Sequence, residues 1–349
     1  MMAADQSQQG EVMKVKLKPL HEQVIVLTGA TSGIGLVTAR RAADAGARLV
    51  IAARNEEALR ELCAELRERG SEATYVVADV GCEEDVRRIA KEAIRRFGAF
   101  DTWINNAGVA IYGKVEDVSI EDQRRLFDTN FWGVVFGSRI ACEYLRERGG
   151  KLINLGSALS ERSIPIQGVY SASKAALMGF TDALRMELEM DDAPVSVTLI
   201  KPGAIDTPYK NHAGNYIGVK GKNPPPVYAP DAVATAILHA AEHHTRDVVV
   251  GAGGKMTTVL GNMAPRITDK VMGKIMPKLQ RTDEALAGIS KGSLYEPGDD
   301  LEERGGYDQT FEHSLYSDVV RHKYRTAAVL TAAAALGTAA YVYSSRPRQ

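Results

Sequence analysis

Short apolar runs alternate with helix-length segments through the first 255 residues of the chain. The runs begin near residues 24, 49, 75, 102, 152, 196 and 248. The first, Val24-Ile25-Val26-Leu27, is wholly apolar, which is typical of a strand buried on both faces. Such βα repetition predicts a parallel sheet with helices on both faces. We therefore expect an α/β, doubly wound fold with a parallel seven-stranded sheet.

A glycine-rich turn follows the first apolar run at once. It comprises Thr28-Gly29-Ala30-Thr31-Ser32-Gly33-Ile34-Gly35. A helical pattern from Leu36 to Ala45 comes next, is ended by Gly46, and leads into the second run. Strand, glycine turn, helix and strand within about thirty residues form the context of a dinucleotide-binding fingerprint. The glycines let the backbone approach a pyrophosphate, and the helix N-terminus offers it unpaired N–H groups. A merely flexible turn is the alternative.

The end of the second run bears on which dinucleotide is bound. It ends in Ala52-Ala53-Arg54-Asn55, and the first acidic residue after the run is Glu56. A carboxylate at this place hydrogen-bonds the ribose 2′-OH of NAD, whereas an arginine accommodates the 2′-phosphate of NADP. We therefore expect Arg54 to bind the phosphate and NADP, rather than NAD, to be the cofactor. A solvated surface arginine is the alternative interpretation.

Tyr170 and Lys174 lie four residues apart, and Ser157 precedes the tyrosine by thirteen. On a helix this spacing puts both side chains on one face, a turn apart. A free tyrosine has a pKa near ~10, so proton transfer near neutral pH requires lowering it by about three units, roughly 4 kcal/mol. A neighbouring ammonium is the simplest means. Such pairs also arise by chance on exposed helices.

Taken together, these motifs resemble those of the short-chain dehydrogenase/reductase family over about residues 20 to 255. Further matches follow in the family's order: Asp79-Val80 after the third run, Asn105-Asn106-Ala107-Gly108 after the fourth, Asn130 in a helix, then Ser157, Tyr170, Lys174, Pro202-Gly203 and Thr207. No motif position departs from the pattern. The resemblance implies a Rossmann fold and an oxidoreductase that acts on alcohols or carbonyls with a nicotinamide cofactor.

The resemblance also implies roles for four residues. Tyr170 would exchange a proton with the substrate oxygen, and Lys174 would lower its pKa and bind the nicotinamide ribose. Ser157 would hold the substrate oxygen, and Asn130 would anchor a water that links Lys174 to solvent. The alternatives are that Ser157 caps a turn and that Asn130 satisfies buried backbone groups. The implied cofactor contacts are Gly29, Thr31, Ser32, Gly33, Ile34, Gly35, Arg54, Asp79, Val80, Asn106, Ala107, Gly108, Tyr170, Lys174, Pro202, Gly203, Ile205 and Thr207.

Substrate choice is expected in the long irregular stretch 207–228. It contains three glycines and ends near Pro224-Pro225-Pro226. Long irregular segments in compact domains are usually functional lids or disordered, and in the resembling family this region closes over the substrate. Tyr209, Tyr216 and Ile217 suggest an apolar element in such a lid. We therefore expect a small-molecule alcohol or ketone of hydrophobic character.

Composition limits the other function classes. The chain has 349 residues, 45% of them hydrophobic, and a net charge of −1, which gives no electrostatic footprint for nucleic acid. Its three cysteines are scattered and suggest a reducing compartment. His239 and His243 share a helical face without further ligands, so we expect no metal site. The first residues lack an apolar core, which is unlike a secretory signal, and predict a cytoplasmic catalytic domain.

Beyond residue 255 the chain outruns a typical domain of the resembling family. We expect a tail at 1–20, a catalytic domain at 21–255, and an extension and linker at 256–325, with an amphipathic helix at 271–279 and a linker over 291–320. Residues 326–343 are a candidate transmembrane or docking helix. Its seventeen uncharged residues, 327–343, reach only about 25 Å against a hydrocarbon core of ~30 Å. Eight of them are alanine, so docking on a partner subunit is the rival interpretation.

The leading hypothesis is an NADP(H)-dependent alcohol dehydrogenase or carbonyl reductase, membrane-tethered through its C-terminus. An NAD-linked dehydrogenase differs from it only in the role of Arg54. A protein that keeps the fold for nucleotide sensing or scaffolding is a hypothesis of another class, and loss of Tyr170 or Lys174 would have favoured it. A homo-oligomer is expected because oligomers are usual in the resembling family.

Overall fold

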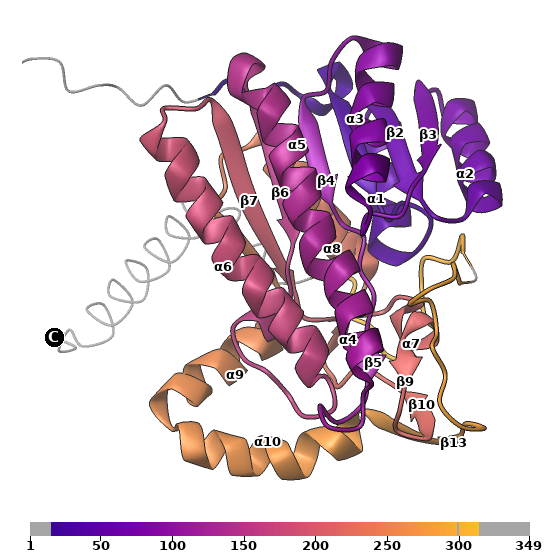
Figure 1. Ribbon diagram of the computed structural model, residues 1–349, viewed down its shortest axis with the longest axis vertical. Coiled ribbons are helices and arrows are strands. Elements are labelled where there is room, and N and C mark those ends of the chain that lie inside the picture. The colour runs from indigo at the N-terminus through magenta and orange to yellow at the C-terminus, as the bar shows by residue number, and fades with distance from the viewer. Residues whose placement is uncertain (1–14, 299, 314–349) are drawn as a thin grey trace, which may run out of the picture.

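The computed structural model describes residues 15–298 and 300–313 and is built on a seven-stranded sheet (Figure 1). All neighbouring strands in this sheet are parallel, in the order β12-β7-β6-β4-β1-β2-β3. The strands are β1 (Val24–Thr28), β2 (Arg48–Ala53), β3 (Ala73–Val77), β4 (Thr102–Asn105), β6 (Gly150–Leu155), β7 (Val195–Pro202) and β12 (Asp247–Val250). The predicted α/β class, strand number and parallel arrangement are confirmed.

Helices cover both faces of the sheet, as its apolar runs require. On one face lie α1 (Gly33–Asp44), α2 (Glu56–Glu68) and α8 (Pro230–Glu242), and on the other α3 (Glu83–Phe97), α5 (Gly133–Arg148) and α6 (Gly168–Met190). Strand β1 shows the two-residue period of this arrangement. Ile25 and Leu27 pack beneath the first set of helices, while Val24 and Val26 pack beneath the second. Each of these four side chains is at most 1% exposed.

Short elements gather at the carboxyl edge of the sheet. They are α4 (Ile120–Phe127), α7 (Tyr209–His212), the helical turns Asp128–Trp132 and Ala158–Ser160, and the strands β5 (Ile111–Tyr112), β8 (Ala204–Ile205), β9 (Gly214–Asn215), β10 (Val219–Gly221) and β11 (Val227–Tyr228). The helical turn Leu20–Glu22 precedes β1 at the opposite edge. β5 pairs with β9, and β8 pairs with β11. The predicted lid, 207–228, therefore has its own short strands and is tied to the rim of the sheet.

The C-terminal extension folds back over this same edge. It forms α9 (Ala252–Met263), α10 (Pro265–Leu279) and β13 (Arg281–Ala285), which pairs antiparallel with β10 of the lid. The predicted amphipathic stretch 271–279 lies in α10. The sequence also predicts a linker over 291–320, but its described part, 291–313, packs on the domain. The reason is partly apolar burial, because Leu294 is 0% exposed.

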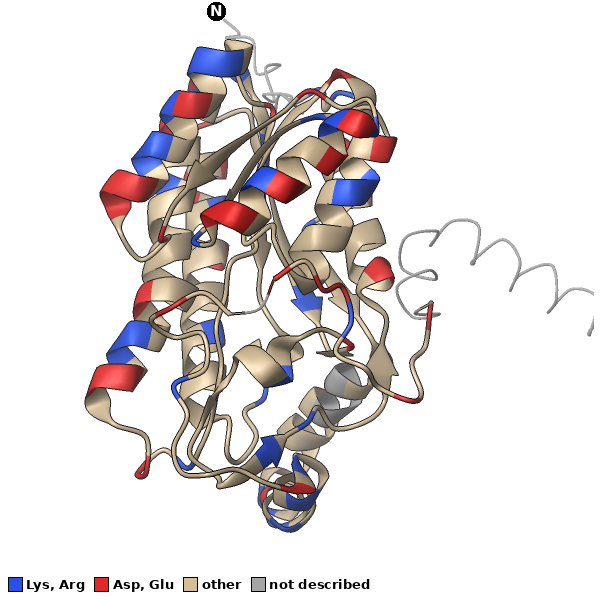
Figure 2. Ribbon diagram, turned by 90° about the vertical axis from the view of Figure 1, so that its right-hand side faces the viewer, with Lys and Arg blue, Asp and Glu red and all other residues tan. Residues whose placement is uncertain are grey.

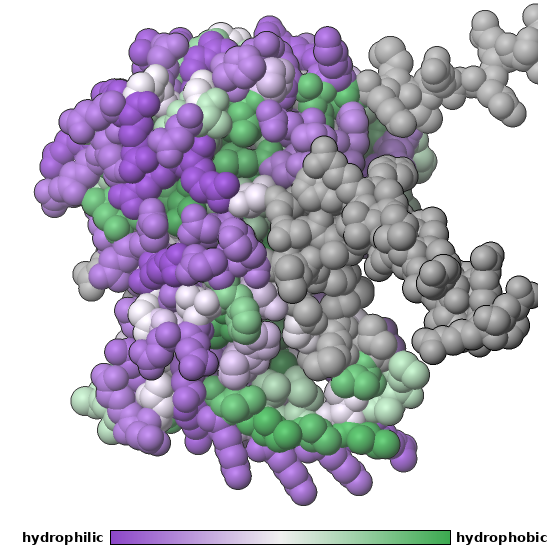
Figure 3. Space-filling model, turned by 180° about the vertical axis from the view of Figure 1, so that it is seen from behind, coloured by the Kyte–Doolittle hydropathy of each residue, from purple (hydrophilic) through white to green (hydrophobic). Residues whose placement is uncertain are grey.

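One side of α10 leaves apolar side chains at the surface. Ile267, Val271 and Ile275 are 46–68% exposed at four-residue spacing, and the exposed Lys270 and Lys274 lie beside them. Figure 3 shows this apolar band along the lower edge of the molecule, with hydrophilic side chains projecting below it. Elsewhere, Figure 2 shows acidic and basic residues interspersed along the helices.

No helix within residues 15–313, as far as they are described, is both long and apolar enough to span a bilayer. The candidate helix predicted at 326–343 lies outside the described residues.

Candidate active site

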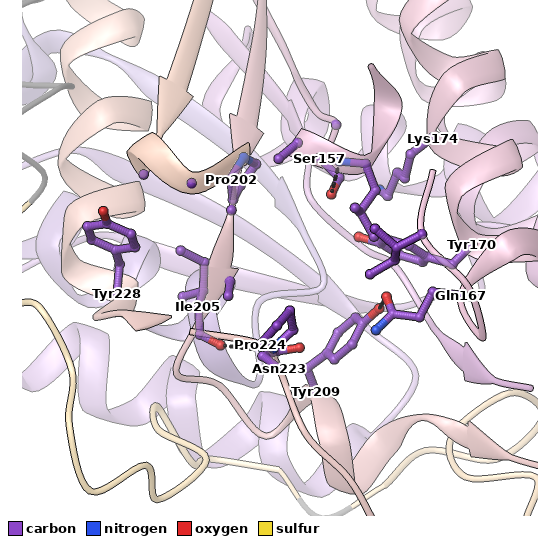
Figure 4. Close-up of a pocket in the computed structure, with 18 of the residues that line it drawn as sticks. Ser157, Gln167, Tyr170, Lys174, Pro202, Ile205, Tyr209, Asn223, Pro224 and Tyr228 are labelled. Carbon is purple, nitrogen blue, oxygen red and sulfur yellow. Dashed lines mark hydrogen bonds between the residues drawn. The ribbon is translucent and has the colours of Figure 1, made fainter. Parts of the chain in front are cut away.

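Tyr170 and Lys174 lie in the first two turns of α6, at the carboxyl edge of the sheet. The Lys174 ammonium is 5.9 Å from the centroid of the Tyr170 ring and donates a 2.8 Å hydrogen bond to the carbonyl oxygen of Leu155, the last residue of β6. Both side chains line a cavity of about 380 Å³ (Figure 4). The helical spacing in the sequence thus brings the pair to one cavity wall.

Ser157 follows β6 and faces the same cavity. Its hydroxyl accepts a 3.1 Å hydrogen bond from the backbone N–H of Leu159 and so caps the short turn Ala158–Ser160. Its side chain also lies on the same cavity wall as Tyr170 and opposes the rise that burial causes in the pKa of that tyrosine. Ser157 therefore caps a turn, as the alternative interpretation held, and it also lines the cavity beside Tyr170.

Burial controls the ionisation of the two titratable groups. It raises the pKa of Tyr170 to about 12, although hydrogen bonds with Ser157 and Tyr209 oppose the shift. Burial likewise lowers the pKa of Lys174 to about 8. The expected depression of the Tyr170 pKa by Lys174 stays a prediction.

Asn130 is fully buried in the π-helical turn Asp128–Trp132 that joins α4 to α5. Its amide exchanges two hydrogen bonds with the backbone of Val109, at 2.8 and 2.9 Å, and donates a third to the Ser173 hydroxyl at 3.2 Å. Asn130 thus satisfies buried backbone groups beneath the site, the alternative considered above. Its role in a water relay stays a prediction.

The glycine turn forms a cradle that has no room for side chains. Gly29 and Gly33 adopt φ of +65° and +51°, a region that L-residues rarely enter. A β-carbon on Gly29 would lie 2.7 Å from the α-carbon of Ala107. The Asn106 amide closes the turn from the next strand, with a 2.9 Å hydrogen bond to the Gly29 carbonyl oxygen. Backbone that carries no side chain beside the start of α1 is the surface that a dinucleotide pyrophosphate requires, so the residues present fit such a cofactor. In this structure the Gly33 N–H donates to the Glu302 carbonyl oxygen.

A second cavity of about 100 Å³ continues from the glycine turn past the end of β2. The two cavities share Gly108 and together are lined by every predicted site residue except Gly33, Gly35 and Asn130. The second is lined by Gly29, Thr31, Ser32, Arg54, Asp79, Val80, Ala107 and Gly108, and the first by Ile34, Asn106, Gly108, Ser157, Tyr170, Lys174, Pro202, Gly203, Ile205 and Thr207.

Arg54 is half-buried, unlike the solvated surface arginine of the alternative interpretation. Its two terminal nitrogens donate hydrogen bonds of 2.6 to 3.3 Å to four consecutive backbone carbonyl oxygens, those of residues 293–296. Burial lowers the pKa of Arg54, against the favourable field of Asp79. The guanidinium therefore lines the predicted cofactor cavity while it also holds the C-terminal segment.

The sequence named Tyr209 only as an apolar element of the lid, and it placed neither Gln167 nor the α10 methionines at the site. The Tyr209 ring meets Tyr170 edge-on at 5.7 Å, and its hydroxyl donates a 3.3 Å hydrogen bond to Gln167, just before α6 (Figure 4). Met272 and Met276 of α10 line the far wall. Hydrophobic spacing predicted α10, but nothing in that pattern says which of its faces meets a cavity.

Metal chemistry has no support in the part of the chain that the structure describes, where no three His, Cys, Asp or Glu side chains converge. The cysteines there are free thiols, of which Cys63 and Cys142 are buried. Burial raises the pKa of Cys142 to about 11, which makes this thiol unreactive at neutral pH.

Comparison with known proteins is consistent with this geometry. The family model for short chain dehydrogenase matches residues 23–216. The uncharacterized oxidoreductase YxnA of Bacillus subtilis (strain 168) is 52% identical over 298 residues, which are 84% of this chain and 83% of that protein. The 11-beta-hydroxysteroid dehydrogenase 1A of Arabidopsis thaliana is 32% identical over 266 residues, 72% of this chain and 74% of that one.

A solved structure gives the corresponding match in three dimensions. The alcohol dehydrogenase from the archaeon Thermococcus sibiricus, in complex with 5-hydroxy-NADP, superposes with a TM-score of 0.58 at 28% identity. The match covers 65% of this chain and 95% of that one.

Proposed function

The chain belongs to the short-chain dehydrogenase/reductase family of oxidoreductases, and we propose that it interconverts a hydrophobic alcohol and the corresponding carbonyl with NADP(H). The observation that carries the proposal is the convergence of Ser157, Tyr170 and Lys174 on the wall of one cavity that adjoins the glycine cradle. Two hydroxyl groups that converge in a largely apolar cavity suit one substrate oxygen.

The proposed chemistry assigns each of these groups a separate task. In reduction, Tyr170 donates its hydroxyl proton to the carbonyl oxygen while Ser157 donates a hydrogen bond to the same oxygen. The ammonium of Lys174, close to the ring, favours the phenolate that remains. In oxidation Tyr170 takes the proton back. The nicotinamide cofactor, when bound, supplies or accepts the hydride.

The NADP preference rests on Arg54 and on the lack of a carboxylate at the end of β2. The first acid there, Glu56, is an exposed residue at the start of α2. A phosphate is a stronger acceptor for a guanidinium than the neutral carbonyls that contact Arg54 here. The 2′-phosphate of NADP can therefore take one of these positions at a net gain, whereas the 2′-OH of NAD cannot.

The proposed substrate class follows from the lining of the larger cavity. Its side chains include Ile164, Ile205, Tyr228, Met272 and Met276, and polar side chains such as Arg162, Gln167 and Asn223 line the rest. Flexible methionines adapt to irregular apolar ligands. A hydroxysteroid or a ketone of similar bulk suits such a cavity, in keeping with the hydroxysteroid dehydrogenase among the relatives.

A paired binding and turnover experiment tests the proposal. Turnover of NADPH and NADH is followed over steroids, retinoids, acyl ketones, sugars and quinones, and the affinity for each cofactor is measured for wild type, Arg54→Ala and Arg60→Ala. Arg60 is an exposed arginine of α2, paired only on its own helix, and serves as the control. We expect Arg54→Ala to weaken the binding of NADPH by about tenfold or more relative to that of NADH, because one charge-assisted hydrogen bond is lost.

Two results of this experiment would count against the proposal. An unchanged NADPH-to-NADH ratio in Arg54→Ala would remove the basis for NADP over NAD. Tight cofactor binding without turnover across the panel would favour the nucleotide-sensing alternative.

We also propose that the protein associates with a membrane and forms a homo-oligomer. The membrane proposal is supported by the uncharged stretch at 327–343 in the sequence and by the apolar band on α10 with its neighbouring lysines. Flotation of the full chain with phosphatidylserine vesicles tests it, with Ile267→Asp expected to float less. Light scattering after size-exclusion chromatography gives the number of subunits, and a monomer would contradict the second proposal.

A further inference from the structure

The C-terminal residues 291–298 and 300–305, here called the strap, lie against the predicted cofactor cavity although the family match ends at residue 216. Its downstream part runs along the glycine turn. The N–H of Leu301 donates to the carbonyl oxygen of Thr31 at 2.7 Å, and the N–H of Gly33 donates to the carbonyl oxygen of Glu302 at 2.9 Å. Two backbone hydrogen bonds therefore join the strap to the phosphate-binding element.

The upstream part of the strap is held by two arginines of the catalytic domain. Arg54 binds the four carbonyl oxygens of residues 293–296, and Arg125 of α4 donates to the Leu294 carbonyl oxygen at 2.8 Å. Arg125 also forms an ion pair with Asp79, which lines the cavity. The strap is thus fixed to the end of β2, to α4 and, through Arg125, to Asp79 beyond the end of β3.

A hydrophobic and a charged anchor secure the start of the strap. The Leu294 side chain is 0% exposed and packs in a cluster with Ile111 and Leu126. Lys291 and Tyr295 bind the two carboxylate oxygens of Asp122, which is itself 0% exposed, at 2.6 and 2.8 Å. None of these six side chains lines the cofactor cavity, so the strap is held in place independently of any ligand.

Between its anchors the strap supplies the outer wall of the smaller cavity. Ser293, Pro297, Gly298 and Asp300 face the cavity opposite the glycine turn, Arg54 and Val80. We propose that the strap is part of the dinucleotide site and closes over the adenosine end of the bound cofactor. The proposal rests on the proposed function, and it implies that the cofactor leaves only when the strap opens.

The chemistry of this wall suits a nucleoside. A serine hydroxyl and backbone groups offer partners to ribose hydroxyls and to the adenine edge, and Pro297 offers an apolar surface to the ring. The Asp300 carboxylate accepts a 3.0 Å hydrogen bond from the Thr31 hydroxyl. Like the cofactor phosphates it is negative, and Arg54, across the same cavity, is the cation that offsets this repulsion.

Release kinetics of NADPH test the strap without any substrate. The fluorescence of bound NADPH is followed in a stopped-flow instrument after mixing with excess NADP⁺, for wild type, Leu294→Ala and Ile289→Ala. Leu294→Ala loosens the strap while every cavity-lining group stays in place. Ile289 is 62% exposed in the same extension and gives a matched large-to-small control. We expect NADPH to leave Leu294→Ala about tenfold faster or more, and Ile289→Ala at the wild-type rate.

An unchanged release rate in a folded Leu294→Ala protein would overturn the proposal. So would tighter binding with faster association, because the strap would then be a plug that the cofactor must displace. Amide hydrogen exchange on the wild-type chain tests whether the strap closes over NADPH even if the variant does not fold. Amides of the strap should gain protection on addition of NADPH, and equal exchange with and without NADPH would refute the closed wall.

These outcomes are distinct from failure of the proposed function. If the wild-type chain binds neither NADPH nor NADH, the proposed function itself is wrong. If it binds NADPH but the strap variant and strap amides do not respond, only the strap proposal is wrong.

Discussion

The substitution Gly35→Ala tests the close packing of the glycine turn against α1. Gly35 lies in the first turn of α1, and a β-carbon there would come within 1.9 Å of the Gly29 carbonyl oxygen. Real β-carbons essentially never come closer than 3.0 Å to such an atom, so the turn or the helix must move by about 1 Å. Because the blocking atom is backbone, no side-chain rotation can relieve the contact.

The effect of a glycine-to-alanine substitution on the free energy of unfolding should have opposite signs at Gly35 and at an unhindered helical glycine. Alanine normally stabilises a helix interior by roughly 0.5–1 kcal/mol over glycine, because it loses less backbone entropy on folding. At Gly35 overpacking should outweigh that gain and cost about 1–3 kcal/mol. Gly179, exposed in α6, has no neighbouring atom within 4 Å of an added β-carbon. Gly179→Ala is therefore the matched control and should gain roughly 0.5–1 kcal/mol.

Urea unfolding followed by circular dichroism measures both variants. Gly35→Ala should unfold at a lower urea concentration than wild type and bind NADPH more weakly, because the Gly29 carbonyl is displaced in the cofactor cavity. Gly179→Ala should unfold at a higher concentration and bind NADPH as wild type does. If Gly35→Ala were as stable as Gly179→Ala, the close approach of the turn to α1 would be wrong.

Two further predictions concern charged groups. Asp122→Ala leaves Lys291 and the strap tyrosine without a buried acceptor, so the free energy of unfolding should fall by about 1–3 kcal/mol; a value equal to wild type in urea unfolding would count against the anchor. Alcohol oxidation needs the phenolate of Tyr170, whose pKa burial raises to about 12, so kcat/KM for oxidation should still rise from pH 8 to 10. Reduction needs the phenol and should not rise over the same interval, and the opposite pair of slopes in initial rates would contradict the assignment.

The sequence predicted the sheet because most residues of its strands are buried and apolar. The side chains of the run at residue 24 alternate between two helix layers, so apolar residues occur at consecutive positions. Tyr170 and Lys174 were found for a similar reason, since a helix fixes the relation of residues four apart. Their meeting with Ser157 follows from the strand that precedes it, as ligands in parallel sheets bind at the carboxyl ends of strands.

The strap could not be predicted from the sequence in the same way. Its residues are rich in Gly, Asp and Glu, which is the composition of a linker, and its described apolar anchors are few: Leu294 is fully buried and Leu301 is partly buried against the core. Most of its hold comes from main-chain carbonyls that accept from Arg54 and Arg125, and a carbonyl has no signature in a sequence. For that reason the sequence predicted only phosphate binding for Arg54 and not its hydrogen bonds to the strap carbonyls.

Proton transfer by Tyr170 can be measured in a single-turnover reduction with bound NADPH. Tyr170→Phe removes one oxygen atom, and Tyr144→Phe removes the same atom from α5, where its hydroxyl contacts only the Gly98 carbonyl among the described groups. We expect a loss of about 10²-fold or more in the rate of NADPH oxidation for Tyr170→Phe, with NADPH affinity unchanged, and no loss for Tyr144→Phe. Equal rates in wild type and Tyr170→Phe would show that Tyr170 does not transfer the proton.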